Sequence, residues 1–297
     1  MNNTLKKLYG DFITVKNYLE VKKRILNLPK TKIYDPTKML DLDIYGDLKT
    51  AEKIVILSHT FSAGTDSFIN VYLAERFYLH GYAVVAFNSP GFRNIITNEP
   101  YTGEIKSQIK LGYIFDNIID FIRQENLDAP VIASAFSAGG GQLISCILAK
   151  YRGIAGIVSI APLLYIPRNS TYLHIPTVLD LSLLYAKNFI KTKQVKKFLK
   201  LLNIGLDSRR LYRINNNEKT SLLQKKNLND IPIVILHCND DTIIPITETR
   251  MFLNRMNSHV SKLIEFSGQG HSLTYSIVGT CIEQCDILCE KWILDKT

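Results

Sequence analysis

The sequence contains few cysteines and no disulfide pattern. None of its five cysteines forms a C-x-x-C pair, and Cys281, Cys285 and Cys289 recur at every fourth position. That spacing places these three on one face of a helix, where they suit a packed stripe better than bridges to one another. We therefore expect reduced thiols in the protein core, with a metal or redox site as the alternative.

Long hydrophobic runs are missing as well. The first residues, MNNTLKKLYGDFITV, include no uninterrupted apolar stretch of signal-peptide length, and no segment approaches the roughly 20 apolar residues that span a membrane. Hydrophobic residues still make up 46% of the chain and charged residues 21%, which is enough apolar material for a large core and too much for a disordered protein. A folded, cytoplasmic protein is expected.

Between residues 50 and 165, short apolar runs alternate with segments of helical periodicity. The expected strands are residues 53–59, 83–88, 129–136 and 154–161. The expected helices between them are residues 66–80, 103–125 and 138–150. Continuous apolar strands separated by helices predict a mostly parallel sheet with both faces covered, which is an α/β fold.

The alternation stops after Pro162. No convincing strand follows until about residue 228, and apolar residues recur instead at helical spacing with lysines opposite them, as in Val195, Phe198, Leu199 and Leu202. Strands return at 231–238 and 262–266, and helices at 246–257 and 272–293. The predicted organisation is a helical extension with edge strands (1–50), an α/β core (51–165 and 228–297) and an inserted helical cap (166–227).

A serine stands where one expected strand gives way to a helix. Residues 135–139, Ala-Phe-Ser-Ala-Gly, have the small-x-Ser-x-small form, a variant of G-x-S-x-G. A serine on such a tight turn presents its hydroxyl above the sheet, and side chains two residues before and after it must be nearly absent. Ser137 is therefore a candidate nucleophile, and the N–H of Ala138 can donate to a developing oxyanion. The alternative is a serine that only caps an ordinary helix.

An acid and a histidine follow the ends of two later strands. The segment LHCNDDTIIP (236–245) closes one strand and opens a helix, and SGQGH (267–271) lies between the last strand and the last helix. The first segment resembles the acid-bearing loop of α/β-hydrolases, commonly G-x-x-D-x-x-V-P, with Cys238 in place of the glycine. This register selects Asp241 over Asp240, and the second segment resembles the family's loop that delivers His271.

The order Ser, Asp, His, each at the carboxyl end of a strand, is that of the α/β-hydrolase superfamily. The resemblance covers roughly residues 50–165 and 228–295. It implies that Ser137 is the nucleophile, His271 its base and Asp241 the acid that orients the base. The loop after the first core strand, HTFSAG (59–64), resembles the family's H-G-x loop and assigns the N–H of Phe61 as the second oxyanion donor, with Thr60 where glycine is usual.

The resemblance implies a serine hydrolase of the esterase, lipase or thioesterase type, which cleaves a small-molecule carboxylic ester or thioester through an acyl-enzyme. It implies no cofactor and no metal ion. An acyltransferase that uses the same triad is one alternative, because the acyl-enzyme half-reaction is shared. A non-catalytic binding protein of the same fold is another, since Ala135, Thr60 and Cys238 depart from the usual residues.

Positive charge gathers in two segments of the chain. The net charge is +9, of which residues 1–32 carry +6 and residues 186–226 carry +10, so that the rest carries −7. One interpretation is a solvated basic surface; the other is attraction to an anionic membrane surface or to an acyl carrier protein. No recognised binding motif accompanies the charge, so no nucleic-acid partner is expected.

Overall fold

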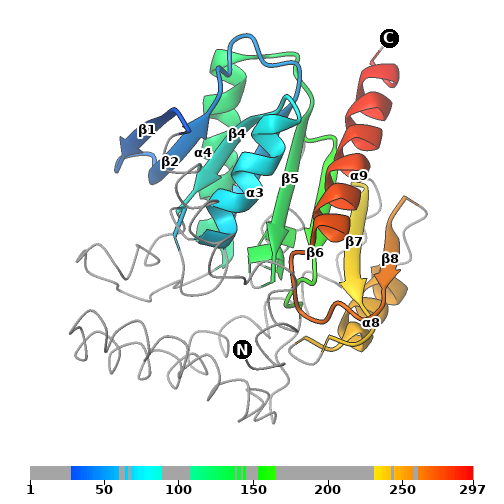
Figure 1. Cartoon of the computed structure of the whole chain (residues 1–297). Helices are drawn as coiled ribbons and strands as arrows, with labels where there is room; N and C mark the ends of the chain where they lie inside the picture. Colours follow the sequence, from blue (N-terminus) through cyan, green and yellow to red (C-terminus); the bar gives the residue numbers. More distant parts are fainter. Residues whose placement is uncertain are drawn as a thin grey trace, which may run out of the picture.

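The computed structural model describes residues 28–59, 64–65, 68–88, 108–137, 139–141, 143–144, 153–164, 231–241, 244–256 and 260–296. These residues contain one eight-stranded sheet of order β1-β2-β4-β3-β5-β6-β7-β8 (Figure 1). The strands are β1 (Lys30–Asp35), β2 (Leu40–Tyr45), β3 (Ile54–Ser58), β4 (Ala83–Phe87), β5 (Val131–Phe136), β6 (Gly156–Ile160), β7 (Ile233–Cys238) and β8 (Lys262–Phe266). The chain thus has the α/β fold that its sequence predicts.

The pairing within the sheet is mostly parallel. β2 runs antiparallel to both of its neighbours, β1 and β4, and every other pair is parallel. All residues of β3 to β7 are buried, which explains why these strands are continuous apolar runs in the sequence. β1 and β8 lie at the two edges and are largely exposed or half-buried.

Helices cover both faces of the sheet. They are α3 (Phe68–Leu79), α4 (Gln108–Glu125), α8 (Ile246–Met256) and α9 (Tyr275–Leu294). Alternate strand residues point to opposite faces, so Val55 and Leu57 pack in one core with α3 and α9, whereas Ile54 and Ile56 pack in a second core with α4 and α8. Figure 1 shows α3 and α9 in front of the sheet and α4 behind it.

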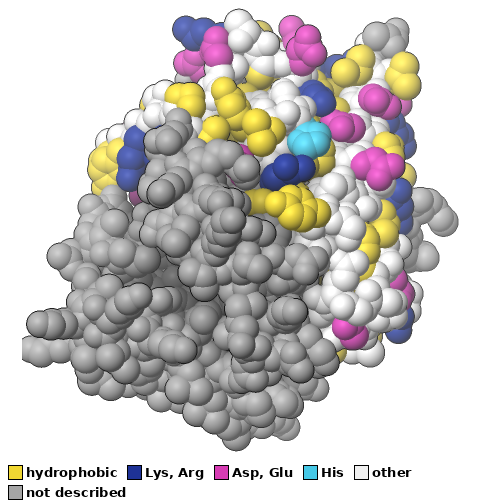
Figure 2. Space-filling view, viewed as in Figure 1, with side chains coloured by type: hydrophobic (Ala, Val, Ile, Leu, Met, Phe, Trp, Pro, Cys, Tyr) yellow, Lys and Arg dark blue, Asp and Glu magenta, His cyan; other side chains and the backbone are white. Residues whose placement is uncertain are grey.

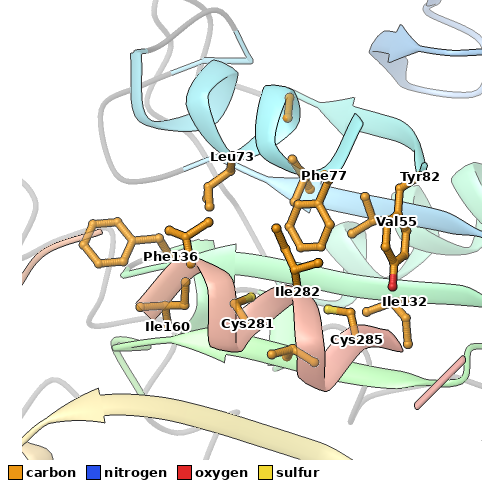
Figure 3. Close-up of a cluster of buried hydrophobic side chains, with 14 of the residues drawn as sticks. Val55, Leu73, Phe77, Tyr82, Ile132, Phe136, Ile160, Cys281, Ile282 and Cys285 are labelled. Atoms are coloured by element: carbon orange, nitrogen blue, oxygen red, sulfur yellow. The ribbon is translucent and has the colours of Figure 1, made fainter. Parts of the chain in front are cut away.

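The cysteine stripe lies on the buried face of α9. Cys281, Cys285 and Cys289 are all buried and unbridged, as the sequence predicts. Figure 3 shows Cys281 and Cys285 facing strand residues such as Ile132 and Ile160. These thiols therefore act as small apolar side chains in the packing between α9 and the sheet.

Several predicted segments lie outside the described residues. They are the N-terminal helical extension over residues 1–27, the cap at 166–227 and most of the basic charge. On the described part of the face shown in Figure 2, charged side chains of both signs are interspersed. Within the described part of the chain, none of the helices combines the length and hydropathy that a membrane crossing requires. The cap boundaries and the cytoplasmic location stay predictions.

The core between the sheet and the helices α3 and α9 predicts that truncation of Leu57 lowers the stability of the fold strongly. This side chain is fully buried in β3, so Leu57→Ala should lower the free energy of unfolding by about 2–5 kcal/mol because it leaves a cavity. The matched control is Leu127→Ala, whose side chain is 73% exposed and should change stability by less than about 0.5 kcal/mol. Urea denaturation followed by circular dichroism measures both. Equal losses in the two variants would contradict the packing described.

Candidate active site

Ser137 occupies a strained turn directly after β5. Its φ angle is +58°, which is uncommon for a residue other than glycine. Hydrogen bonds from neighbouring segments hold it there: its N–H donates to the carbonyl of Ile160 at 2.9 Å, and its carbonyl accepts from the N–H groups of Gly140 and Leu163, each at 3.0 Å. The turn thus lifts the serine hydroxyl above the carboxyl ends of the parallel strands.

The glycines after Ser137 allow a helical segment to start very close to the neighbouring loops. A Cβ atom on Gly139 would collide with the carbonyl oxygen of His59, which follows β3. A Cβ on Gly141 would collide with the carbonyl oxygen of Leu163, which follows β6. The described residues at 139–141 and 143–144 are helical, and they lie within the helix that the sequence predicts over residues 138–150.

The structure brings the three side chains selected from the sequence into one hydrogen-bonded chain. His271 Nε2 lies 3.0 Å from Ser137 Oγ, and His271 Nδ1 lies 2.7 Å from Asp241 Oδ2. An ionised carboxylate can only accept, so Nδ1 carries the proton and Nε2 is left to accept from the serine hydroxyl. This is the arrangement in which imidazole can take a proton from Oγ.

The structure also distinguishes the two neighbouring aspartates. Asp241 contacts His271, whereas Asp240 is exposed and accepts a hydrogen bond from the N–H of Gly270 at 3.2 Å. Asp240 therefore steadies the loop that carries the histidine. The register taken from the sequence, which favours Asp241, agrees with this geometry.

Asp241 is a buried carboxylate with donors on both oxygens. Its Oδ1 accepts from the N–H of Ile244 at 2.8 Å, and its Oδ2 lies 3.3 Å from Nε2 of a second histidine, His237. Burial raises the pKa of Asp241, but the charge interaction with His271 and hydrogen bonds from His237, His271 and the Ile244 N–H outweigh it and hold the pKa well below its usual range. The carboxylate is therefore ionised at neutral pH.

The loop that presents His271 is fixed on several sides. Gly268 and Gly270 have φ angles of +75° and +59°, which glycine adopts without strain. The ring of Phe136, the residue before Ser137, packs on the imidazole with centroids 4.7 Å apart. Figure 3 shows Phe136 at the end of the core between α9 and the sheet. Packing therefore joins the loop that carries His271 to the strand that precedes Ser137.

Sequence reasoning missed two residues of this site. It did not single out His237, and it did not foresee the contact between Phe136 and His271. A signal for His237 existed, because it is a polar residue inside the apolar run IVILHC, four positions before Asp241. The expected oxyanion donors, Phe61 and Ala138, lie outside the described residues. His59, the first residue of the HTFSAG loop, is buried directly after β3.

The sequence matches one family model. The model describes serine aminopeptidases of type S33 and covers residues 49–220, which is more than half of the chain. The chain belongs to this family. It is therefore a member of a family of hydrolases built on the α/β-hydrolase fold, as the motifs around Ser137, Asp241 and His271 had indicated. No curated protein matches the chain in sequence.

Solved structures of similar fold include several enzymes that act on esters. The monoacylglycerol lipase of Paleococcus ferrophilus has a TM-score of 0.58 and 17% identity, covering 84% of this chain and 98% of that one. A soluble variant of monoglyceride lipase from Saccharomyces cerevisiae has a TM-score of 0.57 and 18% identity, covering 90% and 96%. A carboxylesterase structure from Nitrososphaera gargenis has a TM-score of 0.57 and 14% identity, covering 90% and 98%. At these identities the likeness shows the α/β-hydrolase fold alone.

The close approach at Gly141 predicts that this α/β-hydrolase cannot accept alanine there. The added methyl group meets a backbone carbonyl, so Gly141→Ala should lower the free energy of unfolding by about 1–3 kcal/mol or more. Gly279→Ala is the control: it lies inside α9 with open space around it and should raise stability by up to about 1 kcal/mol. Urea denaturation compares the two. A stable Gly141→Ala variant would refute the tight turn.

The lowered pKa of Asp241 predicts a specific response to acid. A carboxyl whose folded pKa is lowered stabilises the protein above its unfolded pKa, and this stabilisation is lost as the pH falls through the folded value. The stability gap between wild type and Asp241→Asn should therefore be largest at neutral pH and shrink below about pH 4. Unfolding free energies between pH 7 and pH 3 test this, with the exposed Asp128→Asn as control. A gap independent of pH would argue against an ionised Asp241.

Proposed function

We propose that this α/β-hydrolase cleaves a carboxylic ester or thioester by acyl transfer to Ser137, with His271 as base and Asp241 as its orienting acid. The observation that carries this proposal is the continuous chain of hydrogen bonds from Ser137 Oγ to His271 Nε2 and from His271 Nδ1 to Asp241 Oδ2, at 3.0 and 2.7 Å. Nucleophile, base and orienting acid within such reach define a site for nucleophilic catalysis.

In the proposed reaction, Ser137 Oγ attacks the substrate carbonyl carbon while His271 Nε2 takes the hydroxyl proton. The imidazolium that forms is stabilised by the ionised carboxylate of Asp241. His271 then gives the proton to the leaving alkoxide or thiolate, and the acyl group stays on Oγ as an ester. Water attacks this acyl-enzyme, His271 takes its proton, and the carboxylic acid leaves as Oγ is reprotonated.

Two features of the site favour catalysis over a non-catalytic binding role. The strained backbone of Ser137 costs folding free energy, and the pKa of the buried Asp241 is strongly lowered by its histidine partners; backbone strain and perturbed pKa values both concentrate at reactive sites. An ester is favoured over an amide by the names of the lipases and the carboxylesterase that share the fold. The family model, described as serine aminopeptidase, makes an amide substrate the competitor.

Two further elements of the proposal concern segments outside the described residues. The backbone N–H groups of Phe61 and Ala138 are proposed to donate hydrogen bonds to the oxyanion. The reaction requires such donors close to the carbonyl group that Ser137 Oγ attacks. The cap at 166–227 is proposed to form the acyl pocket, and its basic charge to attract an anionic membrane surface or an acyl carrier protein.

Labelling with a fluorophosphonate probe tests the nucleophile. Wild type should be labelled, and Ser137→Ala and His271→Ala should lose both the label and at least about a thousandfold in kcat on p-nitrophenyl esters. The control is His80→Ala, whose side chain is exposed directly after α3. Labelling that survives Ser137→Ala would mean that another residue is the nucleophile. A folded but unlabelled wild type would support the binding role.

A substrate panel then separates the competing reactions. It contains p-nitrophenyl esters of increasing chain length, matched acyl thioesters and aminoacyl p-nitroanilides, each assayed with and without glycerol or another acceptor alcohol. The same triad can attack all three kinds of substrate, so their kcat/KM values show which one the site prefers. Higher kcat/KM on esters or thioesters than on anilides supports the proposal. Preference for anilides would replace it with an aminopeptidase. Product esters formed at the expense of free acid would indicate acyl transfer.

A further inference from the structure

His237 is a fully buried histidine that the triad does not include. It is the penultimate residue of β7 and is only 1% exposed, within an otherwise apolar strand. An imidazole removed from water costs free energy unless both ring nitrogens find partners. The hydrogen-bond partners of the two ring nitrogens therefore indicate the role of His237.

Both ring nitrogens of His237 are hydrogen-bonded. Nδ1 lies 2.8 Å from the hydroxyl of Thr249 on α8. Nε2 lies 2.8 Å from the carbonyl oxygen of Ile244 and 3.3 Å from Oδ2 of Asp241. A carbonyl oxygen can only accept, so Nε2 carries a proton whether the ring is neutral or charged. That single N–H is shared between the backbone carbonyl and the carboxylate.

The contacts close a ring around the carboxylate of Asp241. The N–H of Ile244 donates to Oδ1 at 2.8 Å, while the carbonyl of the same residue accepts from His237. Oδ2 accepts from His271, and it also lies 3.3 Å from Nε2 of His237, which is in β7 four residues before Asp241. The side chains of His237 and Asp241 are both fully buried, so water cannot substitute for a missing donor.

We propose that His237 is a positioning residue, which fixes the Asp241 carboxylate so that Oδ2 faces His271 Nδ1. The inference rests on the proposed function, because the orientation of Asp241 matters for activity only if His271 is the base for Ser137. A carboxylate that turned away would leave the imidazole free to adopt the wrong tautomer, with the proton on Nε2, and such a ring cannot accept from the serine. His237 acts through Asp241 and touches none of the reacting atoms.

The competing explanation is purely architectural. His237 also ties β7 to α8 through Thr249, and a buried histidine can serve only to satisfy that contact. The two explanations depend on different ring nitrogens: positioning requires the donor at Nε2, whereas the link to α8 requires Nδ1. Substitutions that retain one polar position and remove the other therefore separate them.

The test compares His237→Gln with His237→Asn. The longer glutamine carries its amide nitrogen to about the place of Nε2, whereas asparagine offers polar atoms only near Nδ1. Positioning predicts that His237→Asn lowers kcat for p-nitrophenyl butyrate by about 10- to 100-fold with KM unchanged, and that His237→Gln recovers most of this loss. His80→Gln, at an exposed site directly after α3, should equal wild type. Thermal denaturation shows which variants are folded.

Proton NMR supplies a readout that a merely architectural role would not move. The proton on His271 Nδ1, in a 2.7 Å hydrogen bond to a carboxylate, should resonate far downfield in wild type and His237→Gln. In folded His237→Asn this signal should shift upfield or vanish. His271→Ala identifies the signal by its absence.

The outcomes are distinguishable from failure of the proposed function. If wild type neither reacts with fluorophosphonate nor hydrolyses any substrate of the panel, the proposed function fails. If wild type is active, but His237→Asn matches or exceeds His237→Gln in kcat, the positioning role of His237 is overturned while the triad stands. The same holds if the downfield proton is identical in all three proteins. Should His237→Asn not fold, His237→Phe replaces it, since its ring fills the site without a donor.

Discussion

The turn after β5 is too crowded to contain ordinary residues. Ser137 has a positive φ angle, and the glycines behind it pass so close to His59 and Leu163 that a Cβ atom has no space. The backbone can take this path only because β6 and the loop after it supply partners, Ile160 and Leu163, for the N–H and carbonyl of Ser137. The position of the serine is thus fixed by the central sheet itself, and the other functional groups are placed relative to it.

A second feature on which the site depends is the negative charge of Asp241, which is buried inside the protein. In the proposed mechanism Asp241 can stabilise the imidazolium of His271 only while it is ionised, and burial alone would favour its neutral form. The cost is offset by the donors arranged around it: the Ile244 N–H and the two histidines. The same contacts that keep the carboxylate charged also fix its direction. Electrostatics and geometry at this site therefore have one structural origin, the donors that β7, the turn after it and the loop after β8 place around Asp241.

The sequence predicts the parts of this structure that depend on local pattern. The strands β3 to β7 are continuous apolar runs because both of their faces are covered, and Ser137 and Asp241 stand out because each follows such a run. His271 stands out because it follows glycines between the last expected strand and the last expected helix. Contacts between distant segments leave no comparable signal. The antiparallel insertion of β2 between β1 and β4, the packing of Phe136 on His271 and the hydrogen bond from His237 to Asp241 all depend on tertiary placement. A polar residue within an apolar strand marks His237 as unusual but does not tell which group it meets.

Two of the departures from the usual motifs prove compatible with a reactive site. Ala135 is fully buried in β5 and is small enough for the turn that follows it. Cys238 replaces a glycine beside Asp241, yet burial, and then the negative charges of Asp240 and Asp241, raise its pKa to about 12. The thiol therefore stays neutral at physiological pH and packs as an apolar group in the same core as Phe136 and Leu273. A charged thiolate there would add a second negative charge beside Asp241, whereas the neutral thiol leaves Asp241 as the carboxylate that pairs with His271 in the proposed reaction.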